Sequence, residues 1–297
     1  MLPEIPQPVL AEMAEIGPRW GSNVPGHVRR MIEAFTPVLA RAPKDGVEVA
    51  RDFPYGEDPR QVLDVYRPKR ARSETALLPV VLFLHGGAFV DGEKDRTPEI
   101  YSNVLYYLAR HGILGINVEY RLAPLHKYPS GTEDVRRAVS WARGNAATFG
   151  GDPRRLFLMA HSAGAAHTGA YAYGSGDAIA GHIVVSGRVR AEMWPDNPNA
   201  QKVAAYYGTD PDALEKASQV NYVGPSSPRT LIAVAEFENP FIDVHCAELY
   251  FRLARAQGRA GKFLRLEGHN HTSIIASMNT ADERLGREVV AFVSAPR

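Results

Sequence analysis

The stretch Arg155-Leu-Phe-Leu-Met-Ala-His-Ser162-Ala-Gly164 decides the fold of this chain. Its apolar run from Leu156 to Ala160 indicates a short buried strand, and the alanine-rich sequence beyond Gly164 favours a helix. Strand, tight turn and helix with a serine at the apex form the nucleophile-elbow pattern. The sharp turn requires small residues two places before and after the serine, and Ala160 and Gly164 stand there. Glycine is usual at both places, so Ala160 is a departure.

Buried-strand patterns alternate with helical patterns along most of the sequence. The first two strands alternate in hydrophobicity around a turn-rich segment, Tyr55–Pro59, and predict a hairpin. Later strands are continuous apolar runs, as expected for strands covered on both faces. We expect strands at 47–53, 61–66, 80–84, 113–118, 156–160, 182–185, 230–235 and 262–266, and helices at 8–16, 24–35, 98–111, 132–149, 241–257 and 282–293. This order predicts an α/β fold with a mostly parallel central sheet, antiparallel N-terminal strands and helices on both faces.

Two segments lie outside this repeating pattern. Residues 1–45 contain helical spacing of apolar residues but no strand, and we expect them to form a helical cap segment. Residues 46–297 then form the catalytic domain. Within it, residues 186–229 contain aromatic residues and prolines but no buried-strand run. We interpret them as an insertion that forms a lid together with the N-terminal helices.

The composition is that of an ordinary soluble protein, with 45% hydrophobic and 23% charged residues. A formal net charge of +1 gives no electrostatic case for binding nucleic acid or an anionic membrane. The basic run Lys69-Arg70-Ala71-Arg72 is short and fits a solvated turn. Cys246 is the only cysteine, which excludes an intrachain disulfide and a cysteine-based zinc site. With no signal-peptide pattern and no apolar run near the roughly 20 residues that span a bilayer, we expect a cytoplasmic protein.

An elbow serine needs donors for an oxyanion, and two places in the sequence offer them. His85-Gly-Gly-Ala-Phe89 leaves the predicted strand 80–84 at its carboxyl end, where two glycines let the backbone turn and direct N–H groups into a cavity. Ala163, directly after the serine, supplies a further N–H group. An ordinary strand-to-loop turn would explain His-Gly-Gly as well. Beside an elbow we favour an oxyanion hole made by Gly87, Ala88 and Ala163.

The acid and the base should follow later strands, because the carboxyl ends of parallel strands meet at one edge of the sheet. Glu238 comes just after the strand 230–235. Asp243 is the alternative acid, although a first-turn aspartate often serves the helix dipole. His271 follows the last strand and is our choice for the base, with His269 as the alternative. The neighbour of the serine, His161, fits a packing and hydrogen-bonding role.

Serine, acid and histidine in this chain order resemble the α/β-hydrolase superfamily, and within it the hormone-sensitive-lipase-like carboxylesterases. The resemblance rests on these stretches: His85-Gly-Gly-Ala-Phe89, Glu119-Tyr-Arg-Leu-Ala-Pro124, Asp134, Gly150-Gly-Asp-Pro153, Ala160-His-Ser-Ala-Gly164 and Gly268-His-Asn-His271. That family usually has a third glycine where Ala88 stands and an aspartate where Glu238 stands. The sequence around Glu238 is also similar to arylformamidases of the same superfamily, which keeps amide chemistry open.

The resemblance implies a serine hydrolase that cleaves small to medium carboxylic esters through an acyl-enzyme, with Ser162, Glu238 and His271 as the triad. The alternatives are an amidase or arylformamidase with the same triad, and a binding protein that has lost catalysis. No metal or organic cofactor is needed. The expected partner is a small-molecule ester or amide, and an edge strand or the last helix could pair two subunits into a homodimer.

The pocket is less well specified by the sequence than the triad. Phe89, Trp194, Tyr206 and Tyr207 could line it, or they could be ordinary packing residues of the lid. Asp134 precedes the elbow in the chain, and we expect it to be a structural partner of nearby backbone or arginine rather than a catalytic acid.

Overall fold

A computed structural model describes residues 1–69, 76–174 and 178–296 of the chain, and the basic run after Lys69 lies outside them. Its centre is one eight-stranded sheet in the order β1-β2-β4-β3-β5-β6-β7-β8. The strands are β1 (Val47–Pro54), β2 (Val62–Pro68), β3 (Leu78–Leu84), β4 (Leu114–Val118), β5 (Gly151–His161), β6 (Gly181–Val185), β7 (Thr230–Phe237) and β8 (Lys262–Asn270). The helical elements are α1 (Gln7–Ile16), η1 (Gly17–Asn23), α2 (Val24–Ala40), α3 (Ser102–Arg110), α4 (Ser130–Asn145), η2 (Ala146–Phe149), α5 (Gly164–Gly174), α6 (Ala200–Tyr207), α7 (Pro211–Ala217), η3 (Gln219–Tyr222), α8 (Ile242–Gln257), α9 (Ser273–Ala276) and α10 (Arg284–Ser294).

The strand directions confirm the predicted fold class. β1 pairs antiparallel with β2, and β2 pairs antiparallel with β4. Every pairing from β4 onward through β3, β5, β6, β7 and β8 is parallel. β7 and β8 extend two and four residues beyond the predicted ends, because Glu236–Phe237 and Glu267–Asn270 lengthen the strands without continuing the apolar runs that the prediction used. Glu238 and His271 therefore follow directly on the last residue of each strand.

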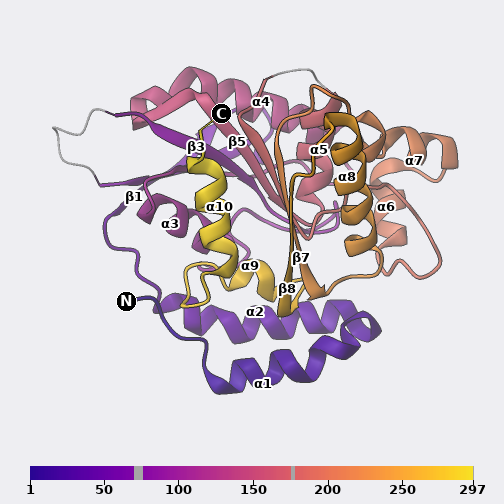
Figure 1. Cartoon of the computed structure of the whole chain (residues 1–297), viewed down its shortest axis with the longest axis horizontal. Coiled ribbons are helices and arrows are strands. Elements are labelled where there is room, and N and C mark those ends of the chain that lie inside the picture. Colours follow the sequence, from indigo (N-terminus) through magenta and orange to yellow (C-terminus); the bar gives the residue numbers. More distant parts are fainter. Residues whose placement is uncertain (70–75, 175–177, 297) are drawn as a thin grey trace.

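Side chains that alternate along the central strands divide the core into two layers. Val81 and Phe83 of β3 pack with α2, α3 and α10 on one face. Val80 and Leu82, the alternate residues of β3, pack with α4, α5 and α8 on the other face. Helices thus cover both faces of the sheet (Figure 1). None of the helices in the described ranges is long and apolar enough to cross a membrane.

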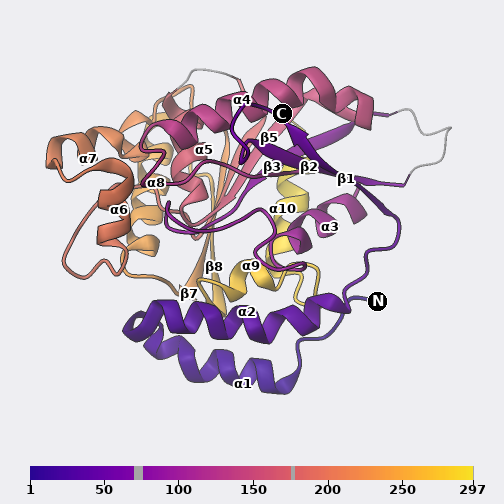
Figure 2. The ribbon, with the colours of Figure 1, turned by 180° about the vertical axis from the view of Figure 1, so that it is seen from behind.

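The N-terminal helices lie across one end of the sheet. Both views show α1 and α2 side by side, next to α9 and the tips of β7 and β8 (Figures 1 and 2). Trp20 of η1 donates its indole N–H to Oδ1 of Asn239 at 2.8 Å, directly after β7. Gly17 lies so close to Phe237 that a Cβ atom there would approach the ring to 2.5 Å. This segment is therefore anchored to the point where the chain leaves β7.

The segment 186–229 contains α6, α7 and η3 at the opposite side of the molecule from α10 (Figure 1). Val203, Tyr206, Leu214 and Ala217 of this segment form a small hydrophobic cluster with Phe89 and Ala163. The segment thus packs on the loops that leave β3 and β5, where the predicted site residues lie. That it acts as a lid with the N-terminal helices stays a prediction.

Candidate active site

Ser162 occupies a sharp turn between β5 and α5. Its φ of 54° lies in the left-handed region, which non-glycine residues seldom adopt. A Cβ atom at Gly164 would come within 2.6 Å of the carbonyl oxygen of His85 and within 2.7 Å of that of Leu84. Glycine is therefore required two residues after the serine. Ala160, two residues before it, fits as a fully buried residue of β5.

Ser162, His271 and Glu238 lie in one line of hydrogen bonds. His271 Nε2 is 2.9 Å from Ser162 Oγ, and His271 Nδ1 is 2.5 Å from Glu238 Oε2. The side chains of His271 and Glu238 are only 5% and 3% exposed, so water competes little for these contacts. With a carboxylate on Nδ1–H, Nε2 is left as an acceptor for the serine proton.

The alternative acid and base lie elsewhere. Asp243 is exposed on α8, where its Oδ1 accepts a hydrogen bond from the N–H of Val244. His269 Nε2 is 2.9 Å from Asp282 Oδ2, and its Nδ1 is 3.1 Å from Ser273 Oγ. Among the described residues, neither side chain forms a hydrogen bond or ion pair with another predicted triad member. The structure therefore brings Glu238 and His271, and not these alternatives, to the serine.

The second carboxylate oxygen of Glu238 is held by two donors that sequence reasoning missed. Ser186 Oγ donates to Glu238 Oε1 at 2.5 Å, and the N–H of Ala235 donates to the same atom at 2.7 Å. Ser186 is fully buried and has a φ of 47°. It follows β6 at its carboxyl end, so the strand-end rule that selected Glu238 and His271 could have found it.

The loop after β3 presents backbone N–H groups next to Ser162. Gly87 has a φ of 144°, and a Cβ atom there would overlap the carbonyl oxygen of Asp91 at 1.7 Å. Ala88 has a φ of 50°, a conformation that costs an alanine about 1–2 kcal/mol and that glycine adopts freely. Across the described ranges, the N–H groups of Gly87, Ala88 and Ala163 have no acceptor within the protein. These three predicted donors are thus available to an oxyanion.

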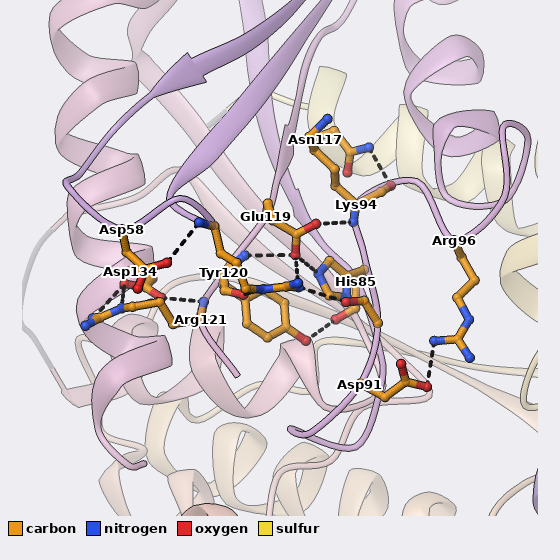
Figure 3. Close-up of polar contacts among 12 residues, drawn as sticks. Asp58, His85, Asp91, Lys94, Arg96, Asn117, Glu119, Tyr120, Arg121 and Asp134 are labelled. Carbon is orange, nitrogen blue, oxygen red and sulfur yellow. Dashed lines mark hydrogen bonds and ion pairs between the residues drawn. The ribbon is translucent and has the colours of Figure 1, made fainter. Parts of the chain in front are cut away.

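Glu119 fixes the ends of this loop (Figure 3). Its carboxylate accepts hydrogen bonds from His85 Nε2 and from the N–H of Lys94, both at 2.9 Å, and it also pairs with Arg60. Burial alone would raise the pKa of Glu119, but the hydrogen bond from His85 and the charges of His85 and Arg60 lower it below its ordinary value. Tyr120 stacks on His85 with 4.3 Å between the ring centroids and donates its hydroxyl to the carbonyl oxygen of His85 at 2.9 Å. The ends of the loop are thus tied to one buried carboxylate.

Asp134 has the structural role that its place in the sequence suggests. It accepts hydrogen bonds from the N–H and Nε of Arg121, both at 2.9 Å, and from Gln61 Nε2 at 2.7 Å (Figure 3). These contacts hold the chain that follows β4 against α4. In the part of the chain that the structure describes, Asp134 forms no hydrogen bond or ion pair with the predicted triad.

His161 and Tyr101 connect the loop after β3 to the predicted base. His161 Nε2 lies 2.8 Å from the carbonyl oxygen of His271, which can only accept, so this nitrogen carries the proton. Nδ1 then accepts from the hydroxyl of Tyr101 at 3.2 Å, and that oxygen accepts from the N–H of Gly86 at 3.2 Å. Burial lowers the pKa of His161 to about 3, which keeps the ring neutral. His161 is therefore a hydrogen-bonding neighbour, as predicted, and no sequence pattern pointed to Tyr101.

A cleft of about 190 Å³ opens above Ser162. It is lined by Val24, Pro25, Val28, Ile32, Gly86, Gly87, Ala88, Asp91, Arg96, Ile100, Tyr101, His161, Ser162, Asn199, Lys202, Asn239, His271, Thr272 and Ile275. Four of these residues belong to α2 and Lys202 belongs to α6, so both segments outside the repeating pattern contribute to it.

The expectation that Phe89, Trp194 and Tyr206 line the pocket is corrected by their positions. Phe89 and Tyr206 are both 1% exposed and stack on each other with 4.9 Å between centroids. Trp194 is 46% exposed and packs edge-on against Phe241. None of the three is among the lining residues. Phe89 and Tyr206 are packing residues, because the ring of Tyr206 turns inward against the loop after β3, whereas Trp194 lies at the surface.

Comparisons with known proteins agree with this arrangement. Residues 63–178 match a family model described as BD-FAE. Over 110 residues, 37% of this chain, the sequence is 42% identical to Esterase LipC of Mycobacterium tuberculosis. Among solved structures, one described as Bacterial Heroin Esterase covers 97% of this chain and 97% of its own length, with a TM-score of 0.74 and 21% identity. The chain has the α/β-hydrolase fold.

The sequence matches of this chain to curated proteins are local. Isoprenylcysteine alpha-carbonyl methylesterase ICME of Arabidopsis thaliana is 36% identical over 119 residues, which cover 40% of this chain. The matched segments span about a quarter of the length of LipC and of ICME, 26% in each case. They support the predicted resemblance to esterases of the superfamily, and the structural likeness supports the fold.

Proposed function

We propose that this chain cleaves carboxylic esters through an acyl-enzyme intermediate, with Ser162 as the nucleophile. The observation that carries the proposal is the line of hydrogen bonds from Ser162 through His271 to Glu238, next to three N–H groups without an acceptor. The names of the curated relatives, which include esterases and carboxylesterases, support the same class of reaction.

In the proposed first step, Ser162 Oγ attacks the ester carbonyl carbon while His271 Nε2 takes the serine proton. Glu238 holds His271 in the tautomer that can accept it and stabilises the imidazolium that forms. The N–H groups of Gly87, Ala88 and Ala163 stabilise the oxyanion, at about 3 kcal/mol for each donor. His271 then protonates the leaving alcohol, and in the second step it activates the water that releases the acid.

The size of the cleft supports small substrates. Its volume of about 190 Å³ is below the roughly 300–1,000 Å³ of pockets that enclose drug-sized ligands. We therefore propose esters with short acyl and alcohol groups. The same arrangement would also serve small amides or formamides, so the test compares both.

The test is hydrolysis of p-nitrophenyl acetate and N-formylkynurenine by the wild type and by Ser162→Ala. We expect the ester to be the better substrate and its turnover to fall to background in the variant, with an unchanged circular dichroism spectrum. Ser22→Ala, an exposed serine of η1, is the control and should keep full activity. A fluorophosphonate probe should label the wild type and the control but not Ser162→Ala.

Unchanged ester turnover in Ser162→Ala would exclude the proposed nucleophile. Faster turnover of the formamide than of the ester would show that amide hydrolysis, and not ester hydrolysis, is the preferred reaction. If the probe labels no serine and neither substrate is turned over, the chain is a binding protein on this scaffold.

A further inference from the structure

The lining of the cleft divides into an apolar wall and a basic wall. The apolar wall consists of Val24, Pro25, Val28 and Ile32, all from α2. The basic wall consists of Asp91 and Arg96 from the loop after β3, with Asn199 and Lys202 at the start of α6. An ester with two hydrocarbon arms would need only the first kind of wall. The basic wall therefore requires its own explanation.

The charges of the basic wall do not balance. Arg96 Nη1 lies 2.8 Å from Asp91 Oδ2, and this pair accounts for one positive and one negative charge (Figure 3). Within the described ranges, Lys202 forms no ion pair with a carboxylate, and its amine makes no hydrogen bond. Burial alone would raise the pKa of Asp91, but hydrogen bonds from Arg96 and the charges of Arg96 and Lys202 lower it. Lys202 therefore lies near Asp91 without pairing with it, and the lining carries one uncompensated positive charge.

The stability of α6 does not explain this lysine. Lys202 is the third residue of the helix, and a cation in the first turn is unfavourable next to the positive end of the helix dipole. The first turn of α6 has no acidic residue, and the side chain of Asn199 makes no capping hydrogen bond to the helix. An anion in the cleft would compensate for this unfavourable positive charge, because it would lie next to both Lys202 and the positive end of the α6 helix dipole.

We propose that Lys202 binds a carboxylate of the substrate, so that the preferred substrates are small esters that carry a carboxylate in addition to the scissile bond. This inference rests on the proposed function and specifies its substrate class. The uncharged arm of such an ester would lie against the α2 residues of the apolar wall. Asp91 would limit the attraction, since it is the one carboxylate among the described residues that line the cleft.

The carboxylate could belong to either part of the ester, and two matched pairs of substrates distinguish them. In the first pair, monomethyl glutarate carries the carboxylate in its acyl group and methyl butyrate lacks it. In the second pair, 4-acetoxybenzoate carries the carboxylate in its leaving group and 4-acetoxybenzamide is the neutral partner. The measured quantity is the ratio of kcat/KM for the charged substrate to that for its neutral partner, followed by proton release at low ionic strength.

We expect a ratio above one in at least one pair for the wild type. Lys202→Met should lower that ratio about fivefold, the effect of one partly screened charge pair. Asp91→Asn should raise it, because it removes the opposing negative charge. Lys216→Met is the matched control: it removes the same charge from an exposed position on α7, outside the cleft, and should leave the ratio unchanged. Added salt should lower the wild-type ratio.

Two results would overturn the inference. One is a ratio of one or less in both pairs while the neutral esters are hydrolysed with dependence on Ser162, which leaves the proposed function intact. The other is a ratio that Lys202→Met and Lys216→Met change equally. If no ester is hydrolysed, the proposed function fails, and calorimetric titration of 4-acetoxybenzoate into the wild type and Lys202→Met decides the inference by binding alone. Equal affinities would then contradict it.

Discussion

The residues around Ser162 and the walls of the cleft above it are held in place by different means. Glu238 is fixed by Ser186 and the backbone of Ala235, and the loop after β3 is fixed by the buried Glu119. The apolar wall comes from α2, and the basic wall combines the far part of the loop after β3 with the start of α6, where Lys202 has no ion-pair partner among the described residues. The proposed chemistry is thus built into the core, while the proposed substrate choice rests on segments added to it.

This difference predicts how substitutions should act. A change in the core contacts should reduce kcat or stability for every substrate. A change in a wall should alter the relative rates of different substrates, with little effect on the folded state. The following substitutions test this division, from the largest expected effect to the smallest.

Glu238→Gln should cause the largest loss of activity. The glutamine can still accept hydrogen bonds from Ser186 and Ala235 through its oxygen, so its amide group would face His271 Nδ1. That donor forces the proton onto Nε2, where it can no longer accept the serine proton. We expect kcat to fall by about 10³- to 10⁴-fold. Asp243→Asn, on the exposed side of α8, is the control and should keep its activity; comparable losses in both variants would contradict the assignment of the acid.

Glu119→Gln should destabilise the fold without touching the predicted triad. It leaves the partly exposed Arg60 without a counter-charge, and removing one partner of such a pair costs about 2–3 kcal/mol when solvent screens part of it. The control is Glu48→Gln. Glu48 and Arg67 pair across the edge strands with both side chains more than 40% exposed, and that change should cost less than about 1 kcal/mol. Urea unfolding measures both, and equal effects would contradict a core role for Glu119.

Acid should weaken the fold through three buried histidines. Burial lowers the pKa of His161, His167 and His182 to about 3. Between this value and about 6.5 the unfolded chain binds protons that the folded chain does not, so stability falls as the pH drops. Each histidine should contribute a loss of about 2 kcal/mol at pH 5.

The pH effect is tested by comparing the free energy of unfolding at pH 7.5 and pH 5. His182→Gln should reduce the difference between the two values, because it removes one of the buried groups that take up a proton on unfolding. His111→Gln, on a partly exposed histidine after α3, should change it less. A wild-type stability that is the same at both pH values would contradict the neutral state of these rings.

Tyr101→Phe should have a smaller effect on catalysis. It removes the hydroxyl that links the N–H of Gly86 to His161 Nδ1. Leaving these two buried groups without a partner should cost about 1–3 kcal/mol of stability. We expect kcat to fall about tenfold for charged and neutral esters alike, with KM nearly unchanged. Tyr66→Phe is the control, since this buried hydroxyl has no partner within the described part of the chain. A loss of kcat that differs between substrates would indicate that Tyr101 contacts the substrate and does not only position His161.

Ile32→Ala should have the smallest effect and should change specificity. It shortens one side chain of the apolar wall and widens the cleft beside it. KM for methyl butyrate should rise about threefold, whereas longer acyl groups should gain relative to it. Leu10→Ala, on the outer side of α1, should change neither. If Ile32→Ala lowers kcat equally for all chain lengths, α2 is not a specificity wall.

The sequence by itself determined the fold class and the residues that meet at Ser162. Continuous apolar runs encode strands covered on both faces, and parallel strands bring their carboxyl ends to one edge. The elbow serine, Glu238 and His271 could therefore be chosen from their positions after β5, β7 and β8. Even the choice of His271 over His269, made from the sequence, agrees with where the two side chains lie.

Only the tertiary structure decided which side chains support these residues and which line the cleft. Glu119 meets Arg60 and His85, and Tyr101 meets His161, across separations of 34 to 60 residues. Such contacts form between loops, where hydrophobic periodicity carries no information about direction. For the same reason, the sequence could not show that Phe89 and Tyr206 stack on each other in the interior, or that Lys202 of α6 lines the cleft. The pattern of a strand fixes which face a residue occupies, whereas a loop residue is placed by the surfaces that close around it.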